Sequence, residues 1–311
     1  MSRLVRPMLG ASLAALSAGT AMAADLPSRK APPPVAYVEP VPVFTWTGFY
    51  VGLNAGGTWS NSNNTTVQSA TIFNNAAVLS PLGLTYGPAA ALGSSGVVSS
   101  QNSGFIGGGQ IGYNWQFYNS FVAGIEADIQ GIAGSNKAGN YATIVDRGLP
   151  AAGTNFVGTF ATTSRSLDYL GTVRGRLGWL FTPTLLVYGT GGLAYGGVNS
   201  SVSFIGLQIP NTGSSPFSGA GAFSDTRVGW TAGGGVEWMF WPNWSAKVEY
   251  LYYDLGTVAY ANSASVATLI ATGDTTFVNI SQTRTRFNGN VVRAGVNYHF
   301  NWGAPPVVAK Y

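Results

Sequence analysis

Eight charged side chains stand at alternate positions within stretches that are otherwise mostly apolar. In a β-strand, alternate side chains point to opposite faces, so the charges share one face while bulky apolar residues occupy the other. Acids and bases in equal number can neutralise one another when a sheet brings them together. We therefore predict a buried charge network formed by Glu126, Asp128, Glu237, Glu249, Arg174, Arg176, Lys247 and Arg293.

Other side chains offer little chemistry. The chain has no cysteine and a single histidine, His299, which leaves no thiolate metal site and no credible catalytic triad. Residues 107–112 fit the pattern G-x-G-x-x-G, but strand alternation continues through Trp115, where a dinucleotide site needs a helix. We expect no catalytic residue, no metal and no cofactor. Because no Lys/Arg cluster is present, we also expect no nucleic-acid partner.

Eight alternating stretches predict the strands that carry these charges. Each has about the 9–11 residues that a tilted membrane-spanning strand needs. In the fourth stretch, Leu167 is expected on the apolar face and Asp168 on the charged face. The stretches are Phe49–Trp59, Phe105–Phe117, Phe121–Gln130, Leu167–Phe181, Leu185–Tyr195, Val228–Phe240, Trp244–Tyr253 and Val291–Phe300.

The connections alternate between short and long. Tight turns at residues 118–120, 182–184 and 241–243 contain turn-forming residues. The other four connections have roughly 30–45 residues rich in Ser, Thr, Asn and Gly. This alternation predicts an all-β fold: an eight-stranded antiparallel transmembrane β-barrel with short periplasmic turns and four long extracellular loops. A hairpin within residues 60–103 would make ten strands, and a soluble β-sandwich is the alternative fold.

Aromatic–x–Phe motifs recur four times at regular intervals, at the ends of the stretches where the short turns lie. Rings with polar tips favour a membrane interface, so we predict a periplasmic aromatic girdle. Only 8% of residues are charged, well below the roughly 25% of ordinary soluble domains, which favours lipid around the apolar faces. The predicted girdle consists of Trp115, Phe117, Trp179, Phe181, Trp238, Phe240, Tyr298 and Phe300.

The ends of the chain predict export. Residues 1–23 contain basic residues, a short apolar run and the cleavage pattern Ala21-Met22-Ala23, as a signal peptide does. Residues 24–45 are predicted to form a proline-rich periplasmic linker, residues 46–300 the barrel, and residues 301–311 a short C-terminal tail.

Four stretches resemble a known family: WTGFYVGLNAG (46–56), GGGVEW (233–238), KVEYLYYDLG (247–256) and VRAGVNYHF (292–300). They are similar to small outer-membrane β-barrel proteins of alpha-proteobacteria, often labelled porin family proteins and akin to the OmpA membrane domain. The resemblance implies an eight-stranded barrel with its N-terminus in the periplasm and at most a narrow pore. It also implies contact with outer-membrane lipid and with the barrel-assembly machinery, which would read either Phe300 or Tyr311.

These patterns together predict an exported outer-membrane barrel with a structural or porin-like envelope role. The interior of an eight-stranded barrel is just wide enough for side chains, so the charge network is expected to fill the lumen. An ion path gated by rearranged pairs is the alternative. The other candidate function is a surface adhesin, or a barrel that binds a haem-like or other surface ligand through its long loops.

Overall fold

The structure is a computed structural model that describes residues 44–75, 86–134, 137–147, 155–210 and 213–300. All of these residues belong to one compact unit, Pro42–Tyr311. The predicted signal peptide, most of the predicted linker and the C-terminal tail lie outside the described residues. In the described part of the chain, no helix is long and apolar enough to cross a membrane.

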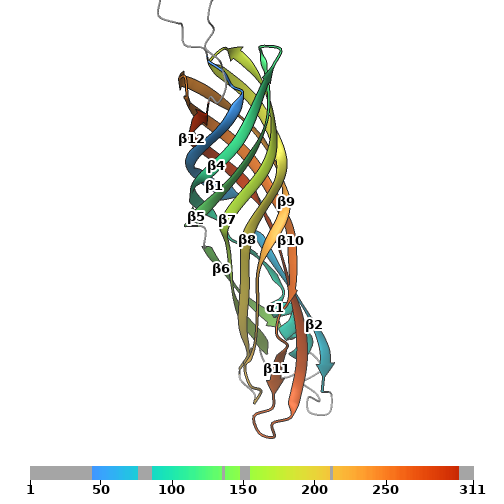
Figure 1. The fold of residues 1–311 in the computed structure, drawn as a ribbon. Coiled ribbons are helices and arrows are strands. Elements are labelled where there is room, and N and C mark those ends of the chain that lie inside the picture. The colour runs from blue at the N-terminus through green and yellow to red at the C-terminus, as the bar shows by residue number, and fades with distance from the viewer. Residues whose placement is uncertain (1–43, 76–85, 135–136, 148–154, 211–212, 301–311) are drawn as a thin grey trace, which may run out of the picture. The chain divides into compact units, whose positions relative to one another are not determined.

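Eight strands pair in a closed antiparallel ring (Figure 1). The first strand pairs with the last, with Phe49 opposite Phe300, so the ring has no unpaired strand edge. The prediction of an all-β antiparallel fold is confirmed. The ring strands are β1 (Gly48–Ser60), β4 (Ser103–Phe117), β5 (Phe121–Ala133), β7 (Phe156–Thr182), β8 (Leu185–Ile209), β9 (Phe217–Trp241), β10 (Trp244–Ala261) and β12 (Thr275–Phe300).

The ring places polar side chains inside and apolar side chains outside. On β4, Ile111 and Trp115 are exposed, whereas Gln110 and Asn114 are buried. This is the reverse of a sheet in a soluble protein, which buries its apolar face. The alternation seen in the sequence therefore holds, with the apolar stripe on the outer surface.

Two of the register shifts lie near the level where the ring strands extend beyond the ring. They lie between Leu167 and Tyr169 on β7 and between Asp254 and Thr257 on β10. A β-bulge inserts an extra residue and so exchanges the two faces of a strand. Leu167 is consequently buried and Asp168 exposed, so the orientation predicted for these two residues is wrong.

Four strands extend far beyond their predicted limits. Much of the Ser- and Thr-rich sequence that was predicted to form four long loops is therefore strand. These segments also alternate: Val202 and Phe204 on β8 are buried between exposed serines. The observed limits are Phe156 on β7, Ile209 on β8, Phe217 on β9 and Thr275 on β12, against predicted limits of Leu167, Tyr195, Val228 and Val291.

The extensions form a second region beyond the ring, here called the stalk. The strands β2 and β3 lie within residues 60–103, where β2 pairs with β12 and with β3, so they extend the stalk and do not enlarge the ring. The helix α1 is buried in the stalk against Phe217 and Phe277 (Figure 1). The stalk comprises residues 156–166, 198–209, 217–226 and 275–288, with β2 (Asn64–Asn74), α1 (Tyr86–Ser94), β3 (Gly96–Ser99), β6 (Lys137–Asp146) and β11 (Ser265–Thr268).

Four layers of buried side chains follow one another along the strands. The lower core, beside the short turns, contains Trp46, Val122, Leu180, Leu186, Tyr188 and Met239. The predicted charged residues come next, on β5, β7, β9, β10 and β12. The upper core then includes Leu170, Leu251 and Val291, and the tip core inside the stalk includes Tyr86, Phe217 and Phe277. The interior is therefore packed from the short turns into the stalk.

Candidate functional site: the buried charge network

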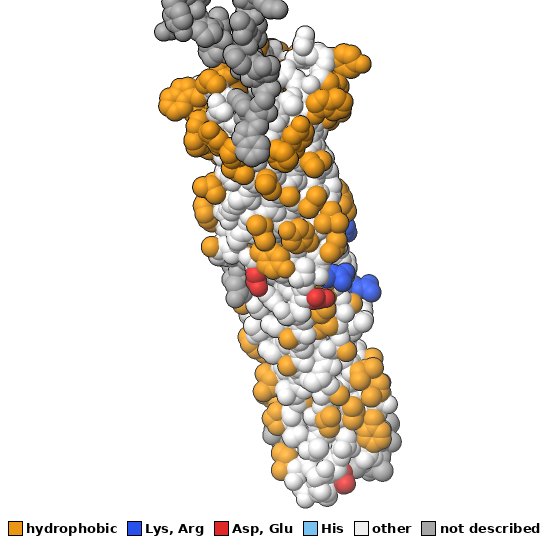
Figure 2. Space-filling model, in the orientation of Figure 1, with side chains coloured by type: hydrophobic (Ala, Val, Ile, Leu, Met, Phe, Trp, Pro, Cys, Tyr) orange, Lys and Arg blue, Asp and Glu red, His pale blue; other side chains and the backbone are white. Residues whose placement is uncertain are grey.

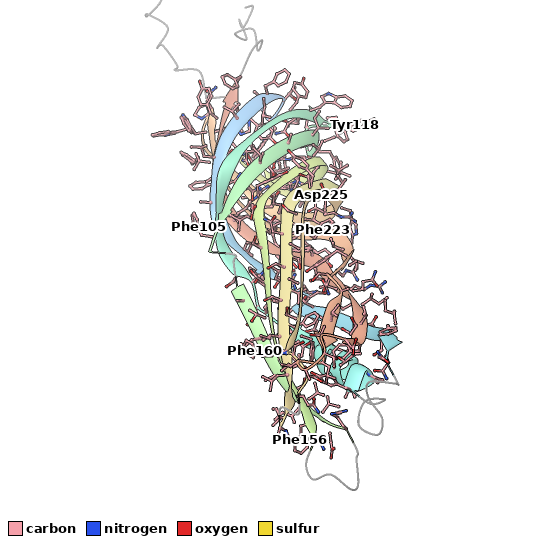
Figure 3. All side chains as sticks on the ribbon, turned by 90° about the horizontal axis from the view of Figure 1, so that it is seen from below. Phe105, Tyr118, Phe156, Phe160, Phe223 and Asp225 are labelled. Atoms are coloured by element: carbon pink, nitrogen blue, oxygen red, sulfur yellow. The ribbon has the colours of Figure 1, made fainter. Side chains whose placement is uncertain are left out.

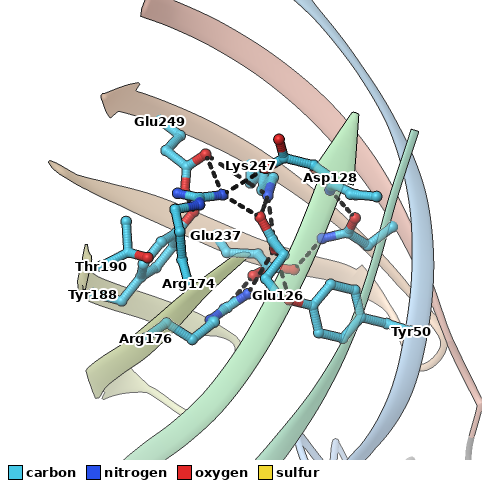
Figure 4. A network of polar contacts seen from close by, with 12 residues as sticks. Tyr50, Glu126, Asp128, Arg174, Arg176, Tyr188, Thr190, Glu237, Lys247 and Glu249 are labelled. Atoms are coloured by element: carbon cyan, nitrogen blue, oxygen red, sulfur yellow. Dashed lines mark hydrogen bonds and ion pairs between the residues drawn. The ribbon is translucent and has the colours of Figure 1, made fainter. Parts of the chain in front are cut away.

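The eight predicted charged residues meet inside the ring (Figure 4). Arg174 is at the centre, with its guanidinium 2.6 Å from Glu126, 3.0 Å from Asp128 and 3.0 Å from Glu249. None of these four side chains is more than 2% exposed. A guanidinium presents five N–H donors in a planar fork, so one arginine can hold several carboxylates at once.

Two further bases surround the same three acids. Lys247 Nζ lies 2.8 Å from Glu126 and 3.9 Å from Glu249. Arg293 lies 2.5 Å from Glu249 and 2.8 Å from Asp128. Three acids thus face three bases. This equality matters because a buried charge without a partner is strongly destabilising.

Arg176 lies 2.6 Å from Glu237 and 3.5 Å from Glu126. Arg176 also donates to the Tyr50 hydroxyl at 3.0 Å, and its guanidinium lies 4.3 Å from the ring centroid of Tyr188. Tyr50 donates in turn to Glu126 at 2.6 Å. The ion pair with Glu126 and the hydroxyl of Tyr50 therefore both join Arg176 to the larger cluster, and the eight charges form one network.

The uncharged members of the network are not among the predicted residues. Tyr50 lies on the polar face of its predicted strand, and this position was the one feature of the sequence that indicated an inward side chain. Its partner Glu126 is on a strand that does not pair with β1, so the sequence could not join the two. Carboxylates of the network accept hydrogen bonds from Tyr50, Thr172, Tyr188, Ser245 and Asn297.

His299 lies beside the network at the end of the ring where the short turns are. Its Nε2 is 2.8 Å from Ser245 Oγ, and that hydroxyl donates to Glu237 at 2.6 Å. Ser245, His299 and Glu237 are all buried. The described residues contain no group of three or more His, Asp or Glu side chains that could hold a metal ion. The arrangement fixes charges in place and provides no exposed reacting group.

The N-terminal end of the described chain covers this end of the ring. The indole N–H of Trp46 donates to the carbonyl of Pro183 at 3.1 Å, and the Trp46 ring packs edge-on against His299. Trp46 is 1% exposed. Phe44, assigned to the linker in the prediction, packs against the same buried cluster as Trp46.

The predicted girdle residues lie on the outer surface beside the short turns. Their rings contact one another in pairs, for example Trp115 with Phe117 at 5.5 Å between centroids. Phe105 lies near the start of β4, and Tyr118 lies in the short turn directly after it (Figure 3). A second aromatic row at the opposite end of the ring is missing from the prediction; it consists of the exposed residues Trp59, Phe105 and Trp230.

A closed antiparallel sheet with an apolar exterior, a charged interior and aromatic rows at both ends defines a membrane β-barrel protein. Residues 11–300 match the family described as outer membrane protein beta-barrel domain, and the chain belongs to this family.

Named relatives agree with this family. The chain is 36% identical over 299 residues to the 31 kDa outer-membrane immunogenic protein of Brucella melitensis, a match that covers 95% of this chain and 100% of that protein. It is 31% identical over 155 residues to the 22 kDa outer membrane protein of Rhizobium leguminosarum, which covers 49% and 54% of the two chains. The predicted resemblance and the predicted location in the outer membrane are confirmed.

Solved structures give a weaker likeness. The outer membrane protein OprG from Pseudomonas aeruginosa aligns over 83% of this chain and 99% of its own, with 9% identity and a TM-score of 0.35. A score this low supports no conclusion about geometry or activity.

Proposed function

We propose that this protein is an eight-stranded transmembrane barrel with a sealed lumen, which stabilises the outer membrane and carries a rigid stalk at the cell surface. The observation that carries this proposal is the continuous column formed by the lower core, the charge network, the upper core and the tip core. A cavity of about 20 Å³ beside Arg165 and Tyr253 has room for about one water molecule. Such packing favours a structural role over solute diffusion.

The apolar exterior of the ring fits one bilayer. At a rise of about 3.3 Å per residue and a tilt of about 40°, residues 105–117 of β4 cover about 30 Å along the barrel axis. That height matches the hydrocarbon core of a bilayer. The short turns then face the periplasm and the stalk faces the outside.

Conductance tests the sealed lumen. Refolded protein inserted into planar bilayers is expected to give no steady openings, because ion pairs and apolar side chains fill the path. A known porin incorporated into the same bilayers provides the positive control. Steady openings on the nanosiemens scale would contradict the sealed lumen.

Single cysteines test the orientation, since the natural chain has none. Ser218→Cys places a thiol at an exposed position of the stalk, and Tyr118→Cys places one at a short turn where the native side chain is 88% exposed. A membrane-impermeant maleimide on intact cells should label the first variant and not the second. The reverse pattern would show that the stalk lies in the periplasm.

A second candidate function is binding at the stalk surface. Exposed apolar side chains lie side by side on β6, β7 and β8, well beyond the ring, and Phe160 is one of them (Figure 3). Apolar patches in water favour contact with another surface. Cells carrying Phe160→Ser with Ile205→Ser should lose adhesion while the barrel still folds; unchanged adhesion would count against this function. The patch comprises Ile144, Phe160, Ile205, Leu207 and Ile209.

A further inference from the structure

Charged side chains on the outer surface gather where the ring meets the stalk (Figure 2). The level is set by the exposed aromatic residues Trp59 and Trp230, which end the apolar zone of the ring. In the orientation proposed above, lipid headgroups with their phosphates lie at this level. This charged belt consists of Asp168, Asp225, Arg227, Arg284 and Arg286.

One part of the belt is a groove of about 460 Å³, a size typical of small-ligand sites. Arg284 and Arg286 are two residues apart on β12, so both side chains emerge on the same face. The lining contains no acidic residue. Its other members are Asn61, Ser62, Asn63, Asn64, Thr66, Thr257 and Thr285.

The two arginines differ in their partners. Arg286 forms an ion pair with Asp254, whose other carboxylate oxygen accepts from the Gly256 amide at 2.9 Å. This contact fixes the guanidinium at the edge of the groove. Arg284 is exposed and forms no ion pair within the described residues. The groove therefore keeps an uncompensated positive charge.

The asparagines of the groove are arranged as donors. The side-chain oxygen of Asn63 accepts from the Ser60 hydroxyl at 2.6 Å, and that of Asn64 accepts from the Ser99 hydroxyl at 2.7 Å. Each oxygen thus accepts one hydrogen bond within the protein. The two NH₂ groups make none among the described residues, so they remain available to a ligand. Asn288 holds the turn by accepting from the Ser62 amide at 2.9 Å. Arginine and amide donors in a lining that contains no carboxylate suit a phosphate.

We propose that this groove binds the phosphate monoester of a glycolipid headgroup in the outer leaflet. Arg284 and Arg286 contact the phosphate oxygens, and the amides of Asn63 and Asn64 donate to the phosphate or to sugar hydroxyls. The site rests on the proposed function for its position beside headgroups. It assigns one ligand class and one groove to a level of the surface that lies among headgroups in general.

Native mass spectrometry of the refolded protein in detergent micelles tests the site. The probes are lipid A with its phosphates and the same lipid after phosphatase treatment. Arg284→Gln should weaken binding of the phosphorylated lipid about tenfold, since it removes one charge-assisted contact, and Arg284→Lys should restore part of it. The matched control is Arg227→Gln, which removes a belt arginine outside the groove and should change binding less than about twofold.

Two results would overturn the proposal: equal losses in Arg284→Gln and Arg227→Gln, or equal binding of the dephosphorylated lipid. Inorganic phosphate distinguishes the two sources of the anion. It should leave the complex intact at the lipid's concentration, and displacement there would overturn the glycolipid assignment. In micelles both ends of the barrel are accessible, so this result is independent of orientation, which the cysteine labelling tests separately.

Discussion

The ring and the stalk are built from the same strands but differ in the types of side chain that they bury and expose. In the ring, β7 buries Arg174 and exposes Val173 and Leu177. In the stalk, the same strand buries Val157 and Ala161. Lipid outside the ring requires an apolar exterior, whereas water outside the stalk requires an apolar core. The surroundings, and not the strand, decide which kind of side chain goes inside.

The two regions meet without a change of sheet. On β9, Glu237 in the ring and Phe217 in the stalk both point inward, so the residue type changes while the phase of the strand stays the same. On β7 and β10 a register shift exchanges the faces instead. The inner face of the sheet therefore changes its residue types in two ways. On β9 apolar residues replace polar ones on the same face, and on β7 and β10 a β-bulge turns the other face inward.

The largest expected effect comes from removing the central arginine of the charge network. Arg174→Met leaves Glu126, Asp128 and Glu249 without the guanidinium that they share, and we expect a loss of about 3–5 kcal/mol in the free energy of unfolding. Urea unfolding in detergent micelles, followed by the gel shift of unboiled protein, measures it. Arg286→Met is the matched control, since its guanidinium is half-exposed. Equal losses would mean that burial of the network contributes nothing.

A somewhat smaller effect should be confined to the stalk. Phe277 packs edge-on against Tyr86 and Phe217, and Phe277→Ala leaves a cavity worth about 3 kcal/mol in the tip core. Hydrogen exchange should rise in the stalk while the gel shift of the ring persists. Ile280→Ala, on the exposed face of β12, serves as control. This prediction assumes that the stalk can open while the ring stays folded. If Phe277→Ala made the whole protein unfold in one step, the assumption would be wrong.

The sharpest contrast comes from one substitution made in both regions. Ile125 on β5 and Ile144 on β6 are 67% and 72% exposed, and each lies opposite a glycine of β7. Ile125→Arg should cost about 2–4 kcal/mol because it faces lipid, whereas Ile144→Arg should stay within about 0.5 kcal/mol because it faces water. Folding into lipid vesicles under urea measures both. Similar costs would place the two residues in the same surroundings.

The parts of the molecule that the sequence could predict are those with a strong local signal. The charges of the network follow from alternation within single strands, as at Glu126 and Asp128, and the short turns from their residue types. Their ion-pair partners lie on strands distant in the chain, so the geometry around Arg174 needed the closed ring. Tyr188 carries no charge and lies next to apolar residues, so nothing in its stretch indicates a contact with Glu249.

The strands of the stalk were not predicted from the sequence, for a different reason. Its strands bury small or polar side chains, such as Thr159 and Thr163 on β7, whose contrast with exposed neighbours is weak. Long Ser- and Thr-rich segments therefore resembled loops. The shift between Leu167 and Tyr169 also breaks the phase at the point where a continuous alternation would have revealed the extension. A bulge depends on pairing with a neighbouring strand, which local sequence does not specify.

The smallest expected effect compares two tyrosines in the stalk. Tyr86 makes no side-chain hydrogen bond within the described residues, whereas Tyr141 donates to the carbonyl of Ser94 at 2.7 Å. At neutral pH, Tyr86→Phe should change the stability of the stalk by less than about 0.5 kcal/mol, and Tyr141→Phe should cost about 1 kcal/mol. Hydrogen exchange in the stalk measures both changes.

The stability of the stalk at alkaline pH extends the comparison of Tyr86 with Tyr141. Burial raises the pKa of Tyr86 to about 12, although Arg147 over its ring acts in the opposite direction. The neutral phenol is therefore favoured in the folded stalk, so its contribution is complete below pH 10 and is lost as pH rises from there to about 12. Tyr86→Phe should remove part of this alkaline loss; Tyr141, whose pKa burial also raises to about 12, accounts for another part. An alkaline profile unchanged in both variants would place the two phenols in water, and with them the tip core.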